Sequence, residues 1–112
     1  PTTGGIRRWW EWHALQPRLG LFAGHEADIP YDYDDLLAMI APRQCLVVSP
    51  MHDRHADLSD IVQCVTTARD AWKQAGHPER LTHLSPDDYN RFEEPQHQVF
   101  IDWLERQVSE AK

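Results

Sequence analysis

One acidic residue in this sequence stands where a carboxylate could take part in chemistry. Asp53 follows the apolar run Cys45-Leu46-Val47-Val48 after a short loop that begins near Pro50. An aspartate after such a run has two interpretations. It closes a turn, since Asp is a common turn former, or it is the acid of a nucleophile–histidine–acid triad, where it holds the imidazole in the right tautomer. The single residue leaves both interpretations open.

The same loop carries several side chains that metals accept as ligands. His52, Asp53, His55 and Asp57 lie within six residues of each other, and His25-Glu26 lies upstream. A zinc site needs three or four converging ligands, and clusters of this kind are common in polar loops. We therefore predict neither a metal site nor a cofactor.

The elements that must position Asp53 are those of an α/β fold. Residues 44–49 are apolar without alternation, which is typical of a strand buried on both faces of a parallel sheet. A helix is predicted from Asp57 or Ser59 to about Gln74, ended by Gly76 and Pro78, and a second strand over 80–84. The ligand end of a parallel sheet lies beyond the carboxyl ends of its strands. The loops 50–56 and 85–93 both belong there.

Two further helices complete the pattern. One helix is predicted over 34–41, because acidic residues stand at its start and a proline follows its end. The other is predicted over 94–109 from its apolar stripe. We expect a partial doubly wound sheet with two parallel strands and three or four helices. The apolar stripe of the last helix comprises Val99, Phe100, Trp103, Leu104 and Val108.

The chain divides into two parts by composition. Residues 1–30 form an irregular Trp-rich segment, with a short helix predicted near 6–14, and residues 31–112 hold the α/β elements. Trp9, Trp10 and Trp12 favour core packing over a carbohydrate or protein contact surface. The acidic cluster that starts at Asp28 is interpreted as helix-start electrostatics.

Three consecutive features resemble the C-terminal part of α/β-hydrolases. They are the run from Asp34-Asp35-Leu36-Leu37 through Ala41-Pro42-Arg43, the strand Cys45–Val48 and then Asp53. The branch it resembles most is that of dienelactone hydrolases and acetyl-xylan esterases, and the resemblance covers roughly residues 31–108. It implies a serine-esterase chemistry on a small ester. It also implies that Asp53 is the triad acid, with the catalytic histidine in the loop after the last strand.

Two departures from that family stand out. No Gly-x-Ser-x-Gly elbow occurs, so the resemblance places the nucleophile upstream of Pro1, in a missing N-terminal half. The family's Gly-His-x-Phe stretch corresponds here to Tyr89-Asn90-Arg91-Phe92, with Asn90 in the histidine position. His97 is the only histidine at or after this loop and is our candidate partner for Asp53, against the alternative that it is an exposed helix residue. His83, inside the strand, is predicted to be structural.

The composition limits the classes of partner that the chain is expected to bind. The net charge of −7, from 18 acidic and 11 basic residues, opposes binding to nucleic acid or to an anionic membrane surface. No apolar run is long enough to cross a bilayer and no signal peptide is recognisable. Cys45 and Cys64 lie in apolar surroundings and are predicted to be small buried side chains, with a single bridge between them as the open alternative and a disulfide scaffold excluded.

Two hypotheses of function follow. In the first, the chain is the C-terminal segment of a serine-esterase-like hydrolase and is inactive alone, because an acyl-enzyme needs a nucleophile. In the second, it is a non-enzymatic assembly module, since a two-stranded sheet leaves edges that invite partners. The expected partner is a second copy of the chain or the missing half.

Overall fold

The computed structural model describes residues 6 and 17–110. Three α-helices and two strands follow each other in this part of the chain, together with three short 3₁₀ helices. The helices are α2 (Tyr33–Ala38), α3 (Leu58–Gln74) and α4 (Glu94–Glu110), and the strands are β1 (Cys45–Val48) and β2 (Leu81–Leu84). The 3₁₀ helices are η2 (Pro17–Phe22), η3 (Glu26–Asp28) and η4 (Pro78–Arg80).

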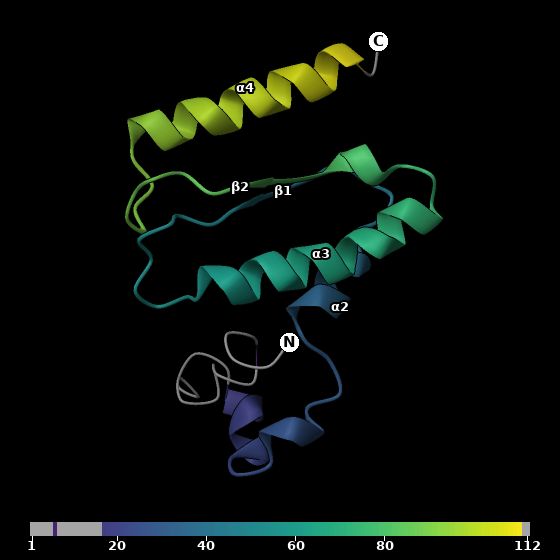
Figure 1. Ribbon diagram of the computed structural model, residues 1–112, viewed down its shortest axis with the longest axis vertical. Coiled ribbons are helices and arrows are strands. Elements are labelled where there is room, and N and C mark those ends of the chain that lie inside the picture. Colours follow the sequence, from purple (N-terminus) through teal and green to yellow (C-terminus); the bar gives the residue numbers. More distant parts are fainter. Residues whose placement is uncertain (1–5, 7–16, 111–112) are drawn as a thin grey trace.

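The two strands form one parallel sheet, which confirms the partial α/β fold. Cys45 pairs with Leu81 and Val48 with Leu84, and α3 makes the crossover between the strands. The sheet lies between α4 on one face and α3 on the other, with α2 beyond α3 (Figure 1). The described bounds of both strands, α3 and α4 lie within one or two residues of the predicted ones.

The core lies between α3 and one face of the sheet. Trp72 and Leu81 are almost completely buried there, with Val65 and Ala68, and Cys45 and Val47 pack against them from β1. The Trp72 ring also satisfies its polar end, because Nε1 donates to the carbonyl of Arg43 at 2.9 Å. α3 is thereby tied to the chain just before β1.

A capping box begins α2. The Asp32 side chain accepts from the backbone of the first turn, while the Asp35 side chain accepts from the backbone N–H of Asp32 at 2.9 Å. This agrees with helix-start electrostatics for the acidic cluster. Asp32 also accepts from the N–H of Ile6 at 2.9 Å. Of the side chains predicted to share one face, Leu37 and Ile40 reach the core, whereas Leu36 is 42% exposed.

The N-terminal part has a small core of its own. Ile6, Leu19 and Ile29 are buried together, and Phe22 and Tyr33 pack against them. The predicted helix near 6–14 and the tryptophans Trp9, Trp10 and Trp12 lie outside the described residues, Ile6 excepted.

The apolar face of α4 is largely uncovered. Trp103 is 8% exposed, but Val99, Phe100, Leu104 and Val108 keep between 41% and 58% of their surface. Two strands are too narrow a platform for a helix of this length. None of the described helices is both long enough and apolar enough to cross a membrane.

Both cysteines are free thiols. Cys64 is buried as predicted, whereas Cys45 is only partly buried. Burial, with the nearby carboxylates Asp34 and Asp32, raises the pKa of Cys64 to about 11. Its thiol is therefore protonated at neutral pH and acts as a small apolar side chain.

Candidate functional site

The loops that follow β1 and β2 lie side by side. The parallel register continues past the strands, since the N–H of Ser49 donates to the carbonyl of Leu84 at 2.9 Å. Beyond it, the N–H of Met51 donates to Pro86 at 2.9 Å and the N–H of His52 to Asp88 at 3.0 Å. The two predicted ligand loops thus form one continuous backbone layer at the carboxyl end of the sheet.

Asp53 sits in this layer as part of a turn. Its N–H donates to the carbonyl of Pro50 at 3.3 Å, and its Oδ1 accepts from the N–H of His55 at 2.8 Å. This is the turn geometry expected of an aspartate. Within the described residues, the second carboxylate oxygen accepts no hydrogen bond, so Asp53 keeps an acceptor for a further partner.

His97 lies on the first turn of α4, and its backbone N–H donates to the carbonyl of Glu93 at 3.0 Å. Its exposed ring packs edge-on against Phe92, with 4.4 Å between ring centroids. Asn90 is exposed on the loop before it. In the chain from 17 to 110, no hydrogen bond joins Asp53 to either of them. The pairing of Asp53 with His97 stays a prediction.

A different histidine–carboxylate pair joins the two loops. His52 Nε2 lies 2.6 Å from Asp87 Oδ1, and the ring of Tyr89 is 5.5 Å from the His52 ring between centroids. In the sequence, His52 stands out only as a possible metal ligand, and Asp87 does not stand out at all. The feature that could have predicted their contact is the strand register, because His52 and Asp87 follow strands that end opposite each other, at Val48 and Leu84.

Asp88 organises the second loop. Its carboxylate accepts from the N–H of Tyr89 at 2.8 Å, from Arg91 Nε at 2.9 Å and from the side-chain amide of Gln96. The Tyr89 backbone donor above all, and then Arg91 and Gln96, hold the pKa of Asp88 below its usual range. The carboxylate therefore ties the loop to the start of α4.

Ser49 and His83 bridge the strands on the α3 side of the sheet. Ser49 Oγ lies 2.5 Å from His83 Nε2 and 3.3 Å from Ser85 Oγ. Burial lowers the pKa of His83, and the positive charge of Arg69 lowers it further. A neutral imidazole that bonds a buried hydroxyl between two strands agrees with the predicted structural role of His83.

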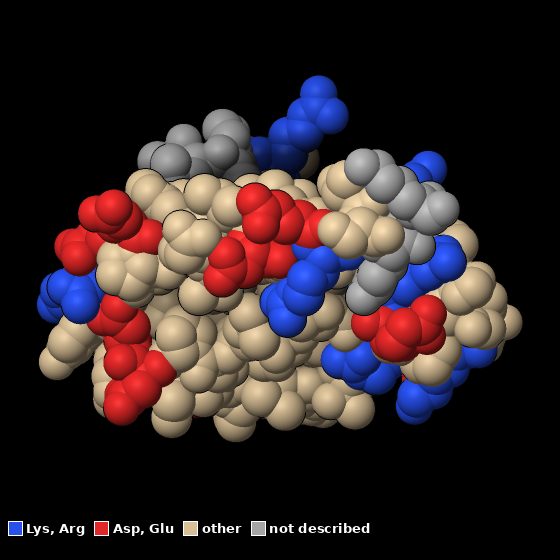
Figure 2. Space-filling model, turned by 90° about the horizontal axis from the view of Figure 1, so that it is seen from above, with Lys and Arg blue, Asp and Glu red and all other residues tan. Residues whose placement is uncertain are grey.

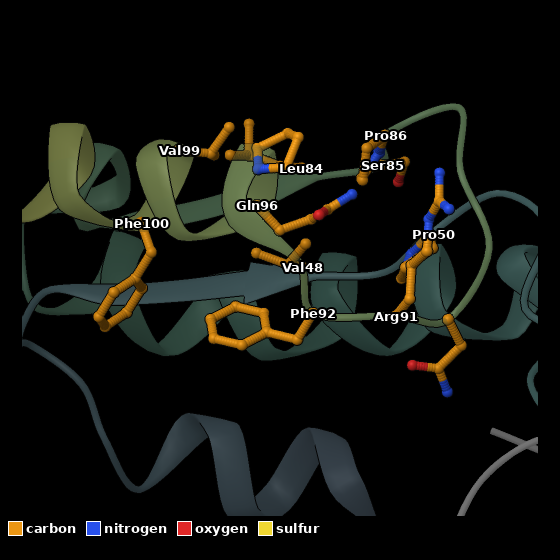
Figure 3. A pocket seen from close by; sticks show the side chains of 12 residues that line it. Val48, Pro50, Leu84, Ser85, Pro86, Arg91, Phe92, Gln96, Val99 and Phe100 are labelled. Atoms are coloured by element: carbon orange, nitrogen blue, oxygen red, sulfur yellow. The ribbon is translucent and has the colours of Figure 1, made fainter.

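An apolar cavity of about 500 Å³ opens on the other face of the sheet (Figure 3). Val48 and Leu84 line it from the strands, and Phe92, Val99 and Phe100 from the segment that leads into α4. Asn90, Arg91 and Gln96 add polar groups to its wall. The cavity exists because α4 covers this face of the sheet incompletely.

The described residues contain no group of three or more His, Cys, Asp or Glu side chains that could hold a metal ion. The cluster from His52 to Asp57 does not converge on one point, because its members bond elsewhere: His52 to Asp87, Asp53 to a backbone N–H, and Asp57 to Ser59.

Comparison with known families decides the affiliation of the chain. A family model described as glucuronyl esterase of fungi matches residues 6–76, which is more than half of the sequence. The chain belongs to the glucuronyl esterase family. The match runs through β1, the Asp53 loop and α3, and ends before β2. No curated protein and no solved structure matches it.

Membership of the glucuronyl esterase family confirms the esterase-like hydrolase inferred from the sequence, since this family holds serine esterases of the α/β-hydrolase type. The narrower resemblance to dienelactone hydrolases and acetyl-xylan esterases stays a prediction.

Proposed function

We propose that this chain is the C-terminal part of the catalytic scaffold of a serine esterase, with Asp53 in the acid position and the nucleophilic serine outside this sequence. The observation that carries the proposal is the family match across β1 and the loop that holds Asp53. The family's description favours esters of glucuronic acid as the substrate class.

The geometry of the loop layer supports an acid role for Asp53. It follows a parallel strand at the end of the sheet where α/β proteins bind ligands. One carboxylate oxygen is fixed by the N–H of His55, so the orientation of the side chain is defined, and the other can accept from an imidazole. His97, at the start of α4, is the candidate to supply that imidazole after its side chain turns away from Phe92.

The first test asks whether the chain works alone. Hydrolysis of 4-nitrophenyl acetate by the purified chain is measured with and without a serine-reactive phosphonate. We expect no phosphonate-sensitive turnover and no phosphonylated serine by mass spectrometry, because an acid without its nucleophile forms no acyl-enzyme. Turnover that the phosphonate abolishes would show that the nucleophile lies within this sequence.

The second test uses the reading frame upstream of Pro1. A strand-turn-helix with Gly-x-Ser-x-Gly in that frame supports the proposal, and its absence contradicts it. In the longer protein, Asp53→Asn should lower kcat on a methyl ester of glucuronic acid by about 10⁴-fold, since an amide no longer holds the imidazole in the productive tautomer. A D53N enzyme with full activity would remove Asp53 from the acid position.

One observation favours a second candidate function, an assembly module. The apolar face of α4 is half exposed, and the α4 side of the molecule shows a broad surface without Lys, Arg, Asp or Glu between its charged clusters (Figure 2). Surfaces of this kind are typical of contact sites between proteins.

A further inference from the structure

The exposed apolar residues of α4 lie on one ridge of the helix. Phe100, Leu104 and Val108 are spaced four residues apart, so they share a face, and each of them is exposed. Charged side chains lie on a different face, where Asp102 and Arg106 line a polar hollow. α4 therefore carries an uncharged apolar ridge that remains exposed in the described chain.

This ridge begins at the apolar cavity. Phe100 lines the cavity together with Phe92 and with Val48 of β1 (Figure 3). The cavity's lining residues on α4 all belong to the N-terminal half of the helix, whereas Leu104 and Val108 belong to its C-terminal half. One helix thus carries an apolar hollow beside one end and exposed apolar side chains toward the other.

Such an arrangement is complementary to itself. When two identical helices pack antiparallel about a two-fold axis, the C-terminal half of each lies beside the N-terminal half of the other. With the axis near Asp102, Leu104 of one copy faces Phe100 of the second. Val108 then reaches the position of Gln96, which lines the cavity. Ridges of residues four apart are also the surfaces through which helices pack most often.

The chain also exposes enough surface for a partner of its own size. A folded monomer of 13.1 kDa exposes about 6,400 Å² of surface. This chain exposes 7928 Å², a surplus of roughly 1,500 Å² over that expectation. An interface of standard size removes about 800 Å² from each partner. The surplus is therefore large enough for a stable dimer.

We propose that two copies of the chain associate through α4, antiparallel about a two-fold axis, so that Leu104 and Val108 of each copy cover the cavity of the other. This inference rests on the assembly function given above as the second candidate, and it names the partner and the arrangement. The α4 side of the molecule has a broad surface without Lys, Arg, Asp or Glu (Figure 2). Two chains of net charge −7 repel each other, so contact through an uncharged face costs least.

Disulfide trapping in the full chain tests the arrangement. Chains with Phe100→Cys and chains with Leu104→Cys are mixed and oxidised with copper phenanthroline, and mass spectrometry identifies the linked products. Two cysteines form a disulfide when their Cα atoms are about 4.4–6.8 Å apart. Facing positions of the antiparallel pair meet this condition, whereas each position is displaced by about 6 Å along the helix from its own counterpart. We expect the mixed dimer to form and the self-linked dimers of either variant to be minor.

Three controls define the background of linked protein. Val108→Cys is displaced by about 18 Å from its counterpart and should not link to itself, although it would do so in a parallel pair. Ser109→Cys lies on the polar face and measures random collision. The parent chain carries only Cys45 and Cys64, and burial raises the pKa of both thiols, so they react slowly at neutral pH. All substituted positions are exposed, so the variants should keep the circular dichroism of the parent.

Amide hydrogen exchange of the unmodified chain gives a second measurement that needs no variant. Exchange over residues 92–108 should slow as the protein concentration rises, because association stabilises the helix at the contact. Exchange that does not depend on concentration, absence of the mixed dimer, or a self-linked Val108→Cys dimer as abundant as the mixed one would each overturn the proposal.

The upstream part of the esterase is the competing occupant of this face. If it covers α4, the same pair of cysteines links no two copies of the longer protein, and that result would also overturn the proposal. Failure of the proposed esterase function has a separate sign, since it appears as phosphonate-sensitive turnover of the chain or as a missing upstream elbow.

Discussion

At the scale of single residues, His83 couples the stability of the sheet to pH. Its pKa is lowered from the ordinary 6.5 because burial, and then Arg69, disfavour the charged ring. The unfolded chain therefore binds a proton at a higher pH than the folded chain does. The contribution of His83 is fully present above about pH 6.5 and is lost as the pH falls from there toward the lower folded value.

We predict that the urea midpoint of unfolding falls between pH 7 and pH 5, and that His83→Gln makes this fall smaller. The variant itself loses the bond to Ser49 and starts from a lower stability at pH 7. Ser85→Ala keeps the buried ring and should follow the pH dependence of the parent. An identical pH dependence in His83→Gln and the parent would contradict the role given to this ring.

At the scale of the elements, α3 is the helix on which the fold depends. It supplies the buried face of Val65, Ala68 and Trp72 and makes the crossover between the strands. Its first turn is closed by Asp57, whose Oδ1 accepts from the N–H of Ser59 at 2.8 Å and from the Ser59 hydroxyl at 2.6 Å. This cap also ends the loop that carries His52 and Asp53, so the start of α3 fixes the length of that loop.

We predict that Asp57→Ala lowers the free energy of unfolding by about 1 kcal/mol, the usual effect of removing an N-cap. Asp57→Asn should retain most of the stability, since its side-chain oxygen can accept the same bonds. The control is Asp70→Ala on the exposed side of α3, where only the pair with Lys73 is lost and the change should stay near 0.2–0.5 kcal/mol, roughly the worth of such a pair. Urea titration followed by Trp fluorescence measures all three, and equal losses at both positions would contradict the cap.

At the scale of the whole molecule, the uncovered face of α4 and the open edges of the sheet have one physical cause. The strand over 44–49 was predicted to be buried on both faces, but β1 is only partly buried and Val48 is 44% exposed, because β1 has one partner strand in the described chain. The apolar side chains Val99, Leu104 and Val108 then remain partly in water. The molecule accordingly keeps apolar surface that a partner could bury.

We predict that the chain forms a dimer or larger oligomer in solution, and that Val108→Glu together with Leu104→Glu reduces it to a monomer. Each substitution places a charge on a side chain that is already exposed, 58% for Val108 and 41% for Leu104, so the monomer should stay folded. Multi-angle light scattering across a concentration series measures the state, with Glu105→Gln on the same helix as control. A parent chain that remains monomeric at high concentration would count against the assembly function.

The sequence by itself determined the order of the two strands and of α2, α3 and α4, and the bounds of all of these except α2, which ends at Ala38 where a helix to residue 41 was predicted. Their signals are local: β-branched and apolar residues over Cys45–Val48, a cap before Leu58 and the Gly76 to Pro78 punctuation after α3. The end of the sheet at which Asp53 lies followed from the same signals, because the loop after a parallel strand lies at the carboxyl end of the sheet. The structural interpretation of His83 also followed, because a residue inside a buried strand has little access to solvent.

Only the tertiary structure decided which side chains meet. His52 and Asp87 are 35 positions apart, and their contact depends on the parallel register and on how each loop turns after its strand. The same holds for α4: its periodicity predicted an apolar face, but whether that face is covered depends on the width of the sheet beneath it. Local patterns specify what each segment is, whereas contacts between segments are set by packing and register, which no single segment encodes.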